Sequence, residues 1–116
     1  MKTKKWLGNV FESSCYKTDE FKDFIRDFRS DLNTMLKGTG WHIVCPFSAG
    51  HFYISGLLYN PFENKHVYIS TSDVRFFRDE WYNHLLIRTA KNEKDFTGGA
   101  NRYCRFYDLP LTLTQF

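Results

Sequence analysis

The residues best suited to chemistry lie in one polar segment that holds a Gly-Gly pair, Gly98-Gly99, followed by Ala100 and Asn101. A Gly-rich turn can present backbone N–H groups to an anion. Four cationic side chains flank it: Arg88, Lys91, Lys94 and Arg102. Phosphate and carboxylate groups bind to this combination, so the segment is a candidate anion-binding loop. The spacing of a P-loop is absent, and a tight turn that requires positive φ is the alternative interpretation.

Cysteine and histidine offer no recognisable metal or nucleophile motif. The three cysteines, Cys15, Cys45 and Cys104, are odd in number and widely spaced, which favours reduced thiols in the cytoplasm over a disulfide scaffold. His42 and Cys45 are three residues apart, and on a regular strand they point to opposite faces. A Cys–His pair assembled in space stays open. We expect no metal, no cofactor and no catalytic residue, and therefore a protein that is not an enzyme.

Aromatic residues are unusually abundant. They make up 19% of the 116 residues, more than a small core can hide, so some should line a groove or an interface. A base-stacking platform could form from aromatic rings that are interleaved with arginines. The rings are Tyr53, Tyr59, Tyr68, Phe76, Phe77, Tyr82, Tyr103 and Tyr107, and the arginines are Arg75, Arg78, Arg88, Arg102 and Arg105. Tyr and Arg are equally the residues of protein interfaces. The net charge of +3 is low for a nucleic-acid binder, and a protein interface fits better.

The clearest predicted element is a helix over residues 19–37. Its apolar residues recur with a period of 3.6: Phe21, Phe24, Ile25, Phe28, Leu32, Met35 and Leu36. Thr18 is the expected N-cap and Gly38 the expected C′ residue. Asp27 and Asp31 fall on the opposite, polar face.

Strand-like sequence follows the helix. Residues 41–47 contain Pro46, which favours an edge strand. Residues 51–59 and 65–70 are predicted to form a hairpin, and 85–90 and 102–109 to form two further strands, with a short helix at 74–83. The predicted fold class is α+β, with one long N-terminal helix packed on an antiparallel sheet of about four to five strands, plus a short helix.

One domain spans residues 1–116, with an irregular N-terminal segment at 1–17 and an extended tail at 110–116. No apolar run reaches 18 residues, so no membrane span is expected. A homodimer, which would conceal surplus apolar surface, stays open.

Residues 38–105 resemble small accessory proteins carried by bacterial phages, plasmids and conjugative elements. The resemblance is sharpest from Leu86-Ile-Arg88-Thr-Ala to Gly98-Gly99-Ala-Asn101. Proteins of this kind include anti-CRISPR inhibitors, which generally act by stoichiometric binding to a Cas effector.

The resemblance implies a non-enzymatic inhibitor in the cytoplasm of a bacterial host, with a partner such as a Cas nuclease and its nucleic acid. Many DNA-mimicking inhibitors are strongly acidic, whereas this chain is basic, so it should cover a protein surface, contact nucleic acid or alter the oligomeric state of the effector. The alternatives are a single-stranded nucleic-acid-binding module and a small-ligand-binding protein or enzyme.

Overall fold

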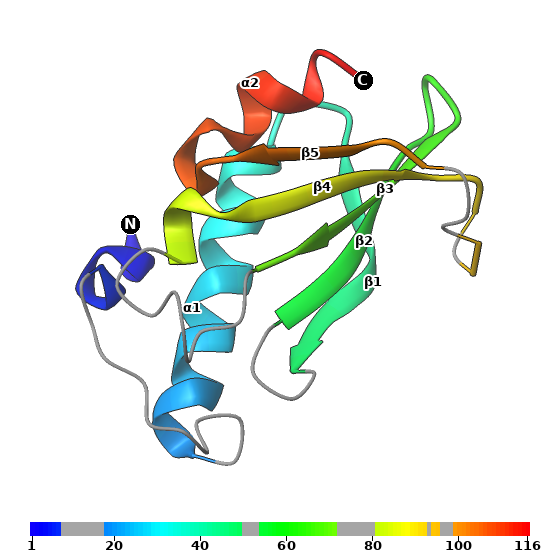
Figure 1. Ribbon diagram of the computed structural model, residues 1–116. Helices are drawn as coiled ribbons and strands as arrows, with labels where there is room; N and C mark the ends of the chain where they lie inside the picture. The colour runs from blue at the N-terminus through cyan, green and yellow to red at the C-terminus, as the bar shows by residue number, and fades with distance from the viewer. Residues whose placement is uncertain (8–17, 50–53, 72–80, 93, 96–98) are drawn as a thin grey trace.

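One long helix, α1 (Asp19–Leu36), packs on one face of a five-stranded antiparallel sheet in the computed structural model of the chain (Figure 1). The structure describes residues 1–7, 18–49, 54–71, 81–92, 94–95 and 99–116. The strands are adjacent in chain order: β1 (His42–Ala49), β2 (Ile54–Asn60), β3 (Lys65–Ser70), β4 (Leu85–Ala90) and β5 (Asn101–Cys104). The predicted α+β class and antiparallel sheet are confirmed.

Helix α1 begins and ends where its capping residues predict. The Thr18 Oγ1 accepts a hydrogen bond from the Phe21 backbone N–H at 3.1 Å, which satisfies one of the first free donors of the helix. The helix ends at Leu36, one residue before the predicted boundary. Gly38 follows with φ of 78°, a left-handed conformation that glycine adopts without steric cost.

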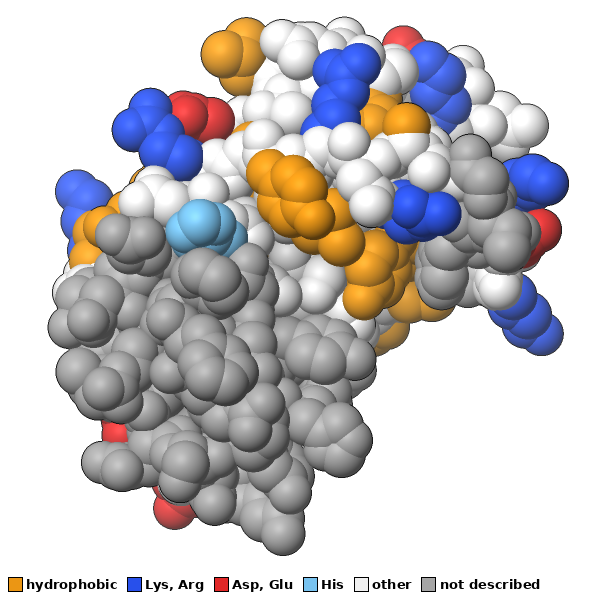
Figure 2. All heavy atoms as spheres, in the orientation of Figure 1, with side chains coloured by type: hydrophobic (Ala, Val, Ile, Leu, Met, Phe, Trp, Pro, Cys, Tyr) orange, Lys and Arg blue, Asp and Glu red, His pale blue; other side chains and the backbone are white. Residues whose placement is uncertain are grey.

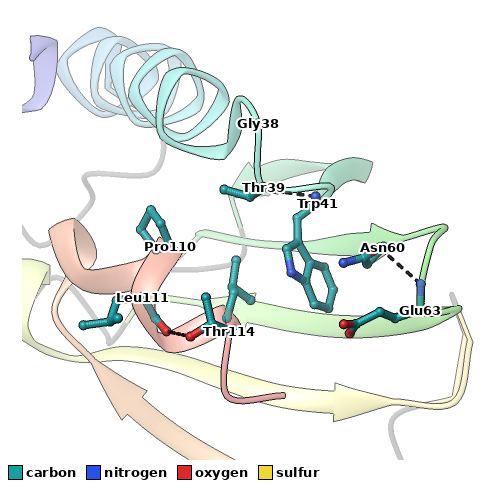
Figure 3. Close-up of a pocket in the computed structure, with 9 residues that line it drawn as sticks. Gly38, Thr39, Trp41, Asn60, Glu63, Pro110, Leu111 and Thr114 are labelled. Carbon is teal, nitrogen blue, oxygen red and sulfur yellow. Dashed lines mark hydrogen bonds between the residues drawn. The ribbon is translucent and has the colours of Figure 1, made fainter.

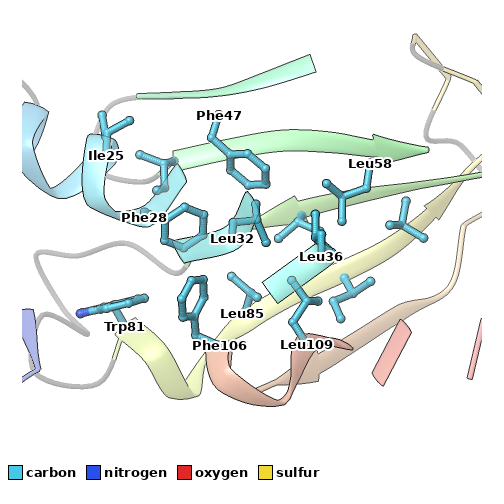
Figure 4. Packing of buried hydrophobic residues seen from close by; sticks show 14 of the residues in the cluster. Ile25, Phe28, Leu32, Leu36, Phe47, Leu58, Trp81, Leu85, Phe106 and Leu109 are labelled. Atoms are coloured by element: carbon cyan, nitrogen blue, oxygen red, sulfur yellow. The ribbon is translucent and has the colours of Figure 1, made fainter. Parts of the chain in front are cut away.

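The core is built largely of aromatic rings between α1 and the sheet (Figure 4). The Phe28 ring centroid lies 5.2 Å from that of Phe47 on β1 and 4.7 Å from that of Phe106. Phe24 meets Trp81 edge to face at 4.9 Å. The core therefore absorbs part of the aromatic surplus, including Trp81 and Phe106 from the second half of the chain.

Alternation along the strands separates the two faces of the sheet. On β2, Ile54 and Leu58 belong to the core, whereas Tyr59 is directed to the other face. Gly56 is also on the core face, where a Cβ would lie 2.6 Å from the Phe47 ring. Strand β1 is at the edge of the sheet, as Pro46 indicates.

The predicted extended tail at 110–116 is wrong. A 3-10 turn at Phe106–Asp108 leads into a short helix, α2 (Leu109–Leu113). Leu109 and Leu113 are four residues apart and both are buried, so a helical turn buries two leucines that an extended chain would also have placed on one face. The last strand is accordingly shorter than predicted, since it ends at Cys104.

The N-terminus is more ordered than predicted, because Lys2–Trp6 forms a 3-10 helix. Its anchors are Asp27 and Asp31 of α1, which are 2% and 3% exposed and therefore do not lie on a solvated face as expected. Asp31 accepts from the Lys2 and Thr3 backbone N–H groups at 3.0 and 2.7 Å. Asp27 accepts from the Trp6 indole at 2.9 Å.

The predicted helix at 74–83 lies mostly outside the described residues. Its last three residues, Trp81–Asn83, form a 3-10 turn. Within the described part of the chain, no helix has the length and apolar character needed to cross a membrane.

Candidate functional site

The sheet face opposite α1, here called the open face, is covered by none of the described helices. Strand register places nine larger side chains on it: His42, Leu57, Tyr59, His66, Tyr68, Leu86, Arg88, Asn101 and Tyr103. Figure 2 shows hydrophobic side chains in a band where Figure 1 places β3 to β5, with Lys and Arg beside them. The described strand residues of this face include no Asp or Glu.

Arg88 lies at the centre of the open face. It is in register with Tyr68 on β3 and with Asn101 on β5. The Arg88 Nη1 donates to the Asn101 Oδ1 at 2.5 Å, and this bond fixes the direction of the guanidinium. Tyr103, two residues from Asn101, is 67% exposed. Aromatic rings therefore flank a held cation, which is a usual composition for a binding surface.

A second aromatic pair extends the open face toward β2. The Tyr59 and His66 rings lie 4.4 Å apart between centroids, with an interplanar angle of 33°. The Tyr59 hydroxyl and the Asn64 Oδ1 are 3.0 Å apart in a hydrogen bond. Both rings are half-buried, so they are positioned before any partner binds.

The connection from β4 to β5 begins with a tight turn. The Lys91 backbone N–H donates to the Asp95 carbonyl at 2.9 Å, and the Lys94 N–H donates to the Asn92 Oδ1 at 2.8 Å. Lys91 and Lys94 are both exposed. The two lysines therefore extend the positive charge of Arg88 beyond the end of the sheet.

Gly99 is needed for a different reason from the predicted one. Its φ is not positive, but a Cβ at this position would lie 2.1 Å from the Thr89 carbonyl oxygen. The next N–H, of Ala100, donates to the Thr89 Oγ1 at 3.0 Å. That donor therefore serves the hairpin and not an anion. Gly98 lies outside the described residues.

The remaining predicted site residues are dispersed. Arg102 is on the core side of the sheet, where its guanidinium carbon is 5.1 Å from the Phe116 ring centroid and its Nη1 donates to Gln115. Tyr82 packs edge to face on Trp81 at 5.9 Å. Arg75 lies outside the described residues. The structure thus brings together Arg88, Asn101 and Tyr103 from the predicted set.

The reasoning that separated His42 from Cys45 is wrong. A register shift between Ile43 and Cys45 places Cys45 opposite Leu57, while His42 is opposite Tyr59, so both side chains are on the open face. Even so, among the residues that the structure describes, no group of three or more His, Cys, Asp or Glu could hold a metal ion.

Cys104 is a poor nucleophile in this environment. Burial raises the pKa of its thiol, and the charge of Asp108 adds to the effect, against a smaller opposite contribution from a hydrogen bond with Thr112. Because the thiolate is the reactive form of cysteine, a raised pKa lowers its reactivity.

A groove of about 570 Å³ lies between the residues that follow α1, the β2–β3 turn and α2 (Figure 3). Trp41 and Asn60 line it although they are only 4% and 6% exposed. Sequence analysis missed this groove, because its walls come from three segments distant in the sequence.

Comparison with protein-family models, with curated proteins and with solved structures finds no match to the chain.

Proposed function

We propose that the chain is a non-enzymatic binding protein that contacts a protein partner through the open face. The observation that carries this proposal is the hydrogen bond from Arg88 to Asn101, beside Tyr68 on β3 and two residues from Tyr103 on β5. Tyr and Arg are the residues in which interface binding energy concentrates, and a cation already held in one direction loses little freedom on binding.

The charge of the open face favours a protein partner over nucleic acid. Arg88 is the only Lys or Arg among the described strand residues of that face, whereas a nucleic-acid groove interleaves several cations with its rings. The absence of carboxylates from those residues suits a partner surface that is neutral or acidic.

The class of partner is proposed from the resemblance to accessory proteins of mobile elements, which is sharpest between Leu86 and Asn101. Three residues of the open face come from that segment: Leu86, Arg88 and Asn101. A host defence nuclease of the Cas type, bound stoichiometrically and thereby inhibited, is the partner that we propose.

A pull-down against purified Cas nucleases, each with and without guide RNA, tests this function. We expect one nuclease to be retained by the wild-type chain and to lose cleavage activity. Tyr103→Ala should weaken retention, while Lys22→Ala on the exposed side of α1 should not. If the chain associates with none of the nucleases and reduces the cleavage activity of none of them, the proposal is overturned.

Single-stranded nucleic acid is the second candidate, favoured by the aromatic rings around Arg88 and by Lys91 and Lys94 at the end of the hairpin. A labelled oligothymidine titrated at rising salt separates the two. Binding through phosphates should weaken by about 0.7 log units per contact for each tenfold rise in salt. Tight, salt-dependent binding that Arg88→Gln weakens would favour nucleic acid.

A further inference from the structure

The groove in Figure 3 holds two hydrogen-bond donors that no described residue accepts. The indoles of Trp6 and Trp81 donate to Asp27 and to the Trp6 carbonyl, whereas the Trp41 indole N–H has no acceptor among the described residues. The Asn60 Oδ1 accepts from the Phe62 and Glu63 N–H groups at 3.0 and 3.3 Å. That assignment leaves the Asn60 amide nitrogen as a donor, and it too has no acceptor in the described part of the chain.

Both donors belong to side chains that are more than nine-tenths buried and that line the groove. In Figure 3 the amide nitrogen of Asn60 points toward the Trp41 ring, and the nitrogen edge of that ring faces the side formed by Leu111 and Thr114. Neither nitrogen belongs to the described polar atoms that are sealed from solvent without a partner, so water reaches both donors through the groove. A ligand that brings acceptors can therefore replace this water without leaving the two donors unpaired.

The hydroxyl groups of the groove are already engaged. The Thr39 Oγ1 donates to the Leu36 carbonyl at 2.7 Å and accepts from the Trp41 backbone N–H at 3.2 Å. The Thr114 Oγ1 donates to the Leu111 carbonyl at 2.6 Å. The groove thus offers the Trp41 indole and the Asn60 amide as donors, and its hydroxyl groups are already used. A matching ligand therefore needs hydrogen-bond acceptors and does not need donors.

The rims of the groove are apolar and carry one acid. Leu111, on α2, lines the groove and is 67% exposed. Pro110 adds a further apolar wall. The Glu63 carboxylate is half-exposed, and its Oε2 is 3.5 Å from the Lys65 Nζ. An exposed pair of this kind is weak, so a basic group of a ligand can compete for the carboxylate.

We propose that this groove binds an extended, proline-rich peptide segment with a basic residue beside the prolines. A proline backbone has carbonyl acceptors and no N–H donors, and its extended form leaves those carbonyls free of internal hydrogen bonds. Trp41 and Asn60 donate to the carbonyls, the prolyl rings contact Pro110 and Leu111, and the basic residue pairs with Glu63. Aromatic-lined grooves recognise such segments in other proteins.

The proposal does not rest on the proposed function, because the groove is lined by residues that follow α1, by the β2–β3 turn and by α2, and by no residue of the open face. The probe is acetyl-(Pro)6-Arg-amide, titrated into the ¹⁵N-labelled chain while the three indole N–H signals are followed. Trp41→Phe identifies the Trp41 signal by its loss. If that variant does not fold, the signal is identified by the fastest hydrogen exchange of the three. We expect the Trp41 signal to shift saturably while those of Trp6 and Trp81 stay in place.

Two controls separate specific binding from general contact. The peptide acetyl-(Gly-Ser)3-Arg-amide, which has equal length and charge, should bind about 10-fold more weakly or not at all. Leu111→Asp changes an exposed residue and should weaken the proline peptide by about 10-fold, while Tyr103→Ala on the open face should leave it unchanged. A Trp41 signal that millimolar proline peptide does not move would overturn the proposal. Equal affinity of the wild-type chain for the glycine–serine and proline peptides would also overturn it. So would equal affinity of the Leu111→Asp variant and the wild-type chain for the proline peptide.

Discussion

The Arg88 guanidinium donates to the Asn101 side chain across the β4–β5 pair, with 2.5 Å between Nη1 and Oδ1. Asn101 is exposed, so the bond lies at the surface of the open face and outside the core. An exposed polar contact contributes little to folding. Its consequence is positional, because it holds Arg88, the one Lys or Arg among the described strand residues of the open face, in the row of Tyr68 and Asn101.

Asn101→Ala should therefore reduce partner binding while leaving the fold intact. We expect a change of about 0.5 kcal/mol or less in the free energy of unfolding and a loss of about 10-fold in affinity. Urea denaturation and a binding titration with the retained nuclease measure the two quantities. A large loss of stability with unchanged affinity would show that Asn101 serves the hairpin instead.

Gly99→Ala should destabilise the β4–β5 hairpin, since the new Cβ would approach within 2.1 Å of the Thr89 carbonyl oxygen. The obstacle is backbone, so the strand must shift, at a cost of about 2 kcal/mol or more. Ala100→Gly, one residue away, is the matched control and should cost about 1 kcal/mol or less. Thermal unfolding of the two variants compares them, and equal midpoints would contradict the packing argument.

Asp31→Ala should release the N-terminal 3-10 helix. Without the carboxylate, the Lys2 and Thr3 N–H groups lose their acceptor, which should cost about 1–3 kcal/mol. Asp23→Ala removes only an exposed pair with Arg26 and should cost less than about 1 kcal/mol. Urea denaturation gives both values. Limited proteolysis should release the first residues of the Asp31 variant first, and identical digestion of both variants would contradict the anchor.

Acid should weaken the contact between Asp27 and Trp6. Burial alone raises the pKa of Asp27, but hydrogen bonds from Trp6 and Lys5 and the charges of Lys5 and Arg26 outweigh it, so the pKa lies below its ordinary 3.8. The stabilisation is thus fully present above the unfolded pKa and is lost as the pH falls through the folded value. Urea denaturation from pH 6 to pH 2 should show the wild-type advantage over Asp27→Asn shrinking below about pH 4. A constant difference would contradict the lowered pKa.

Cys104 should react slowly with iodoacetamide at pH 7, because its raised pKa leaves little thiolate. Peptide mapping by mass spectrometry follows the modification at this residue, with the unfolded chain in urea as the reference. The ratio of unfolded to folded rates should fall as the pH rises toward 10. A folded thiol that reacts as fast as the unfolded one at pH 7 would contradict the raised pKa.

The sequence predicted those elements whose signals are local. The structure confirms the predictions that each depend on one segment: the period of α1, its Thr18 cap and Gly38 turn, and the strand character of β2 to β4. Pro46 likewise predicted the edge position of β1. In these cases local preference and tertiary packing agree.

The errors came from features that only tertiary contact decides. Asp27 and Asp31 are charged residues on the polar side of α1, where the sequence predicts exposure to solvent. The N-terminal residues nevertheless cover them and supply their hydrogen-bond donors. The spacing of Leu109 and Leu113 fits a strand and a helical turn equally well, and packing in the core favours the turn. The groove at Trp41 has no sequence signal, because α1, the β2–β3 turn and α2 create it jointly.

For the open face, pairing across strands was the missing information. Arg88 and Asn101 are 13 residues apart in the chain, and only the register of β4 with β5 makes them neighbours. The same register sends Arg102 to the opposite side, which charge counting along the chain does not predict.

The most direct test of the open face as the binding surface is a cleavage assay with guide-loaded Cas nucleases. Wild-type chain, the double variant Arg88→Ala/Tyr103→Ala and the control Lys22→Ala are each titrated against a fixed amount of nuclease. We predict that the wild type and the control inhibit at equal, stoichiometric amounts, and that the double variant requires about 30-fold more, or about 2 kcal/mol. Inhibition by the double variant at the wild-type concentration, or no inhibition by the wild type, would contradict the account.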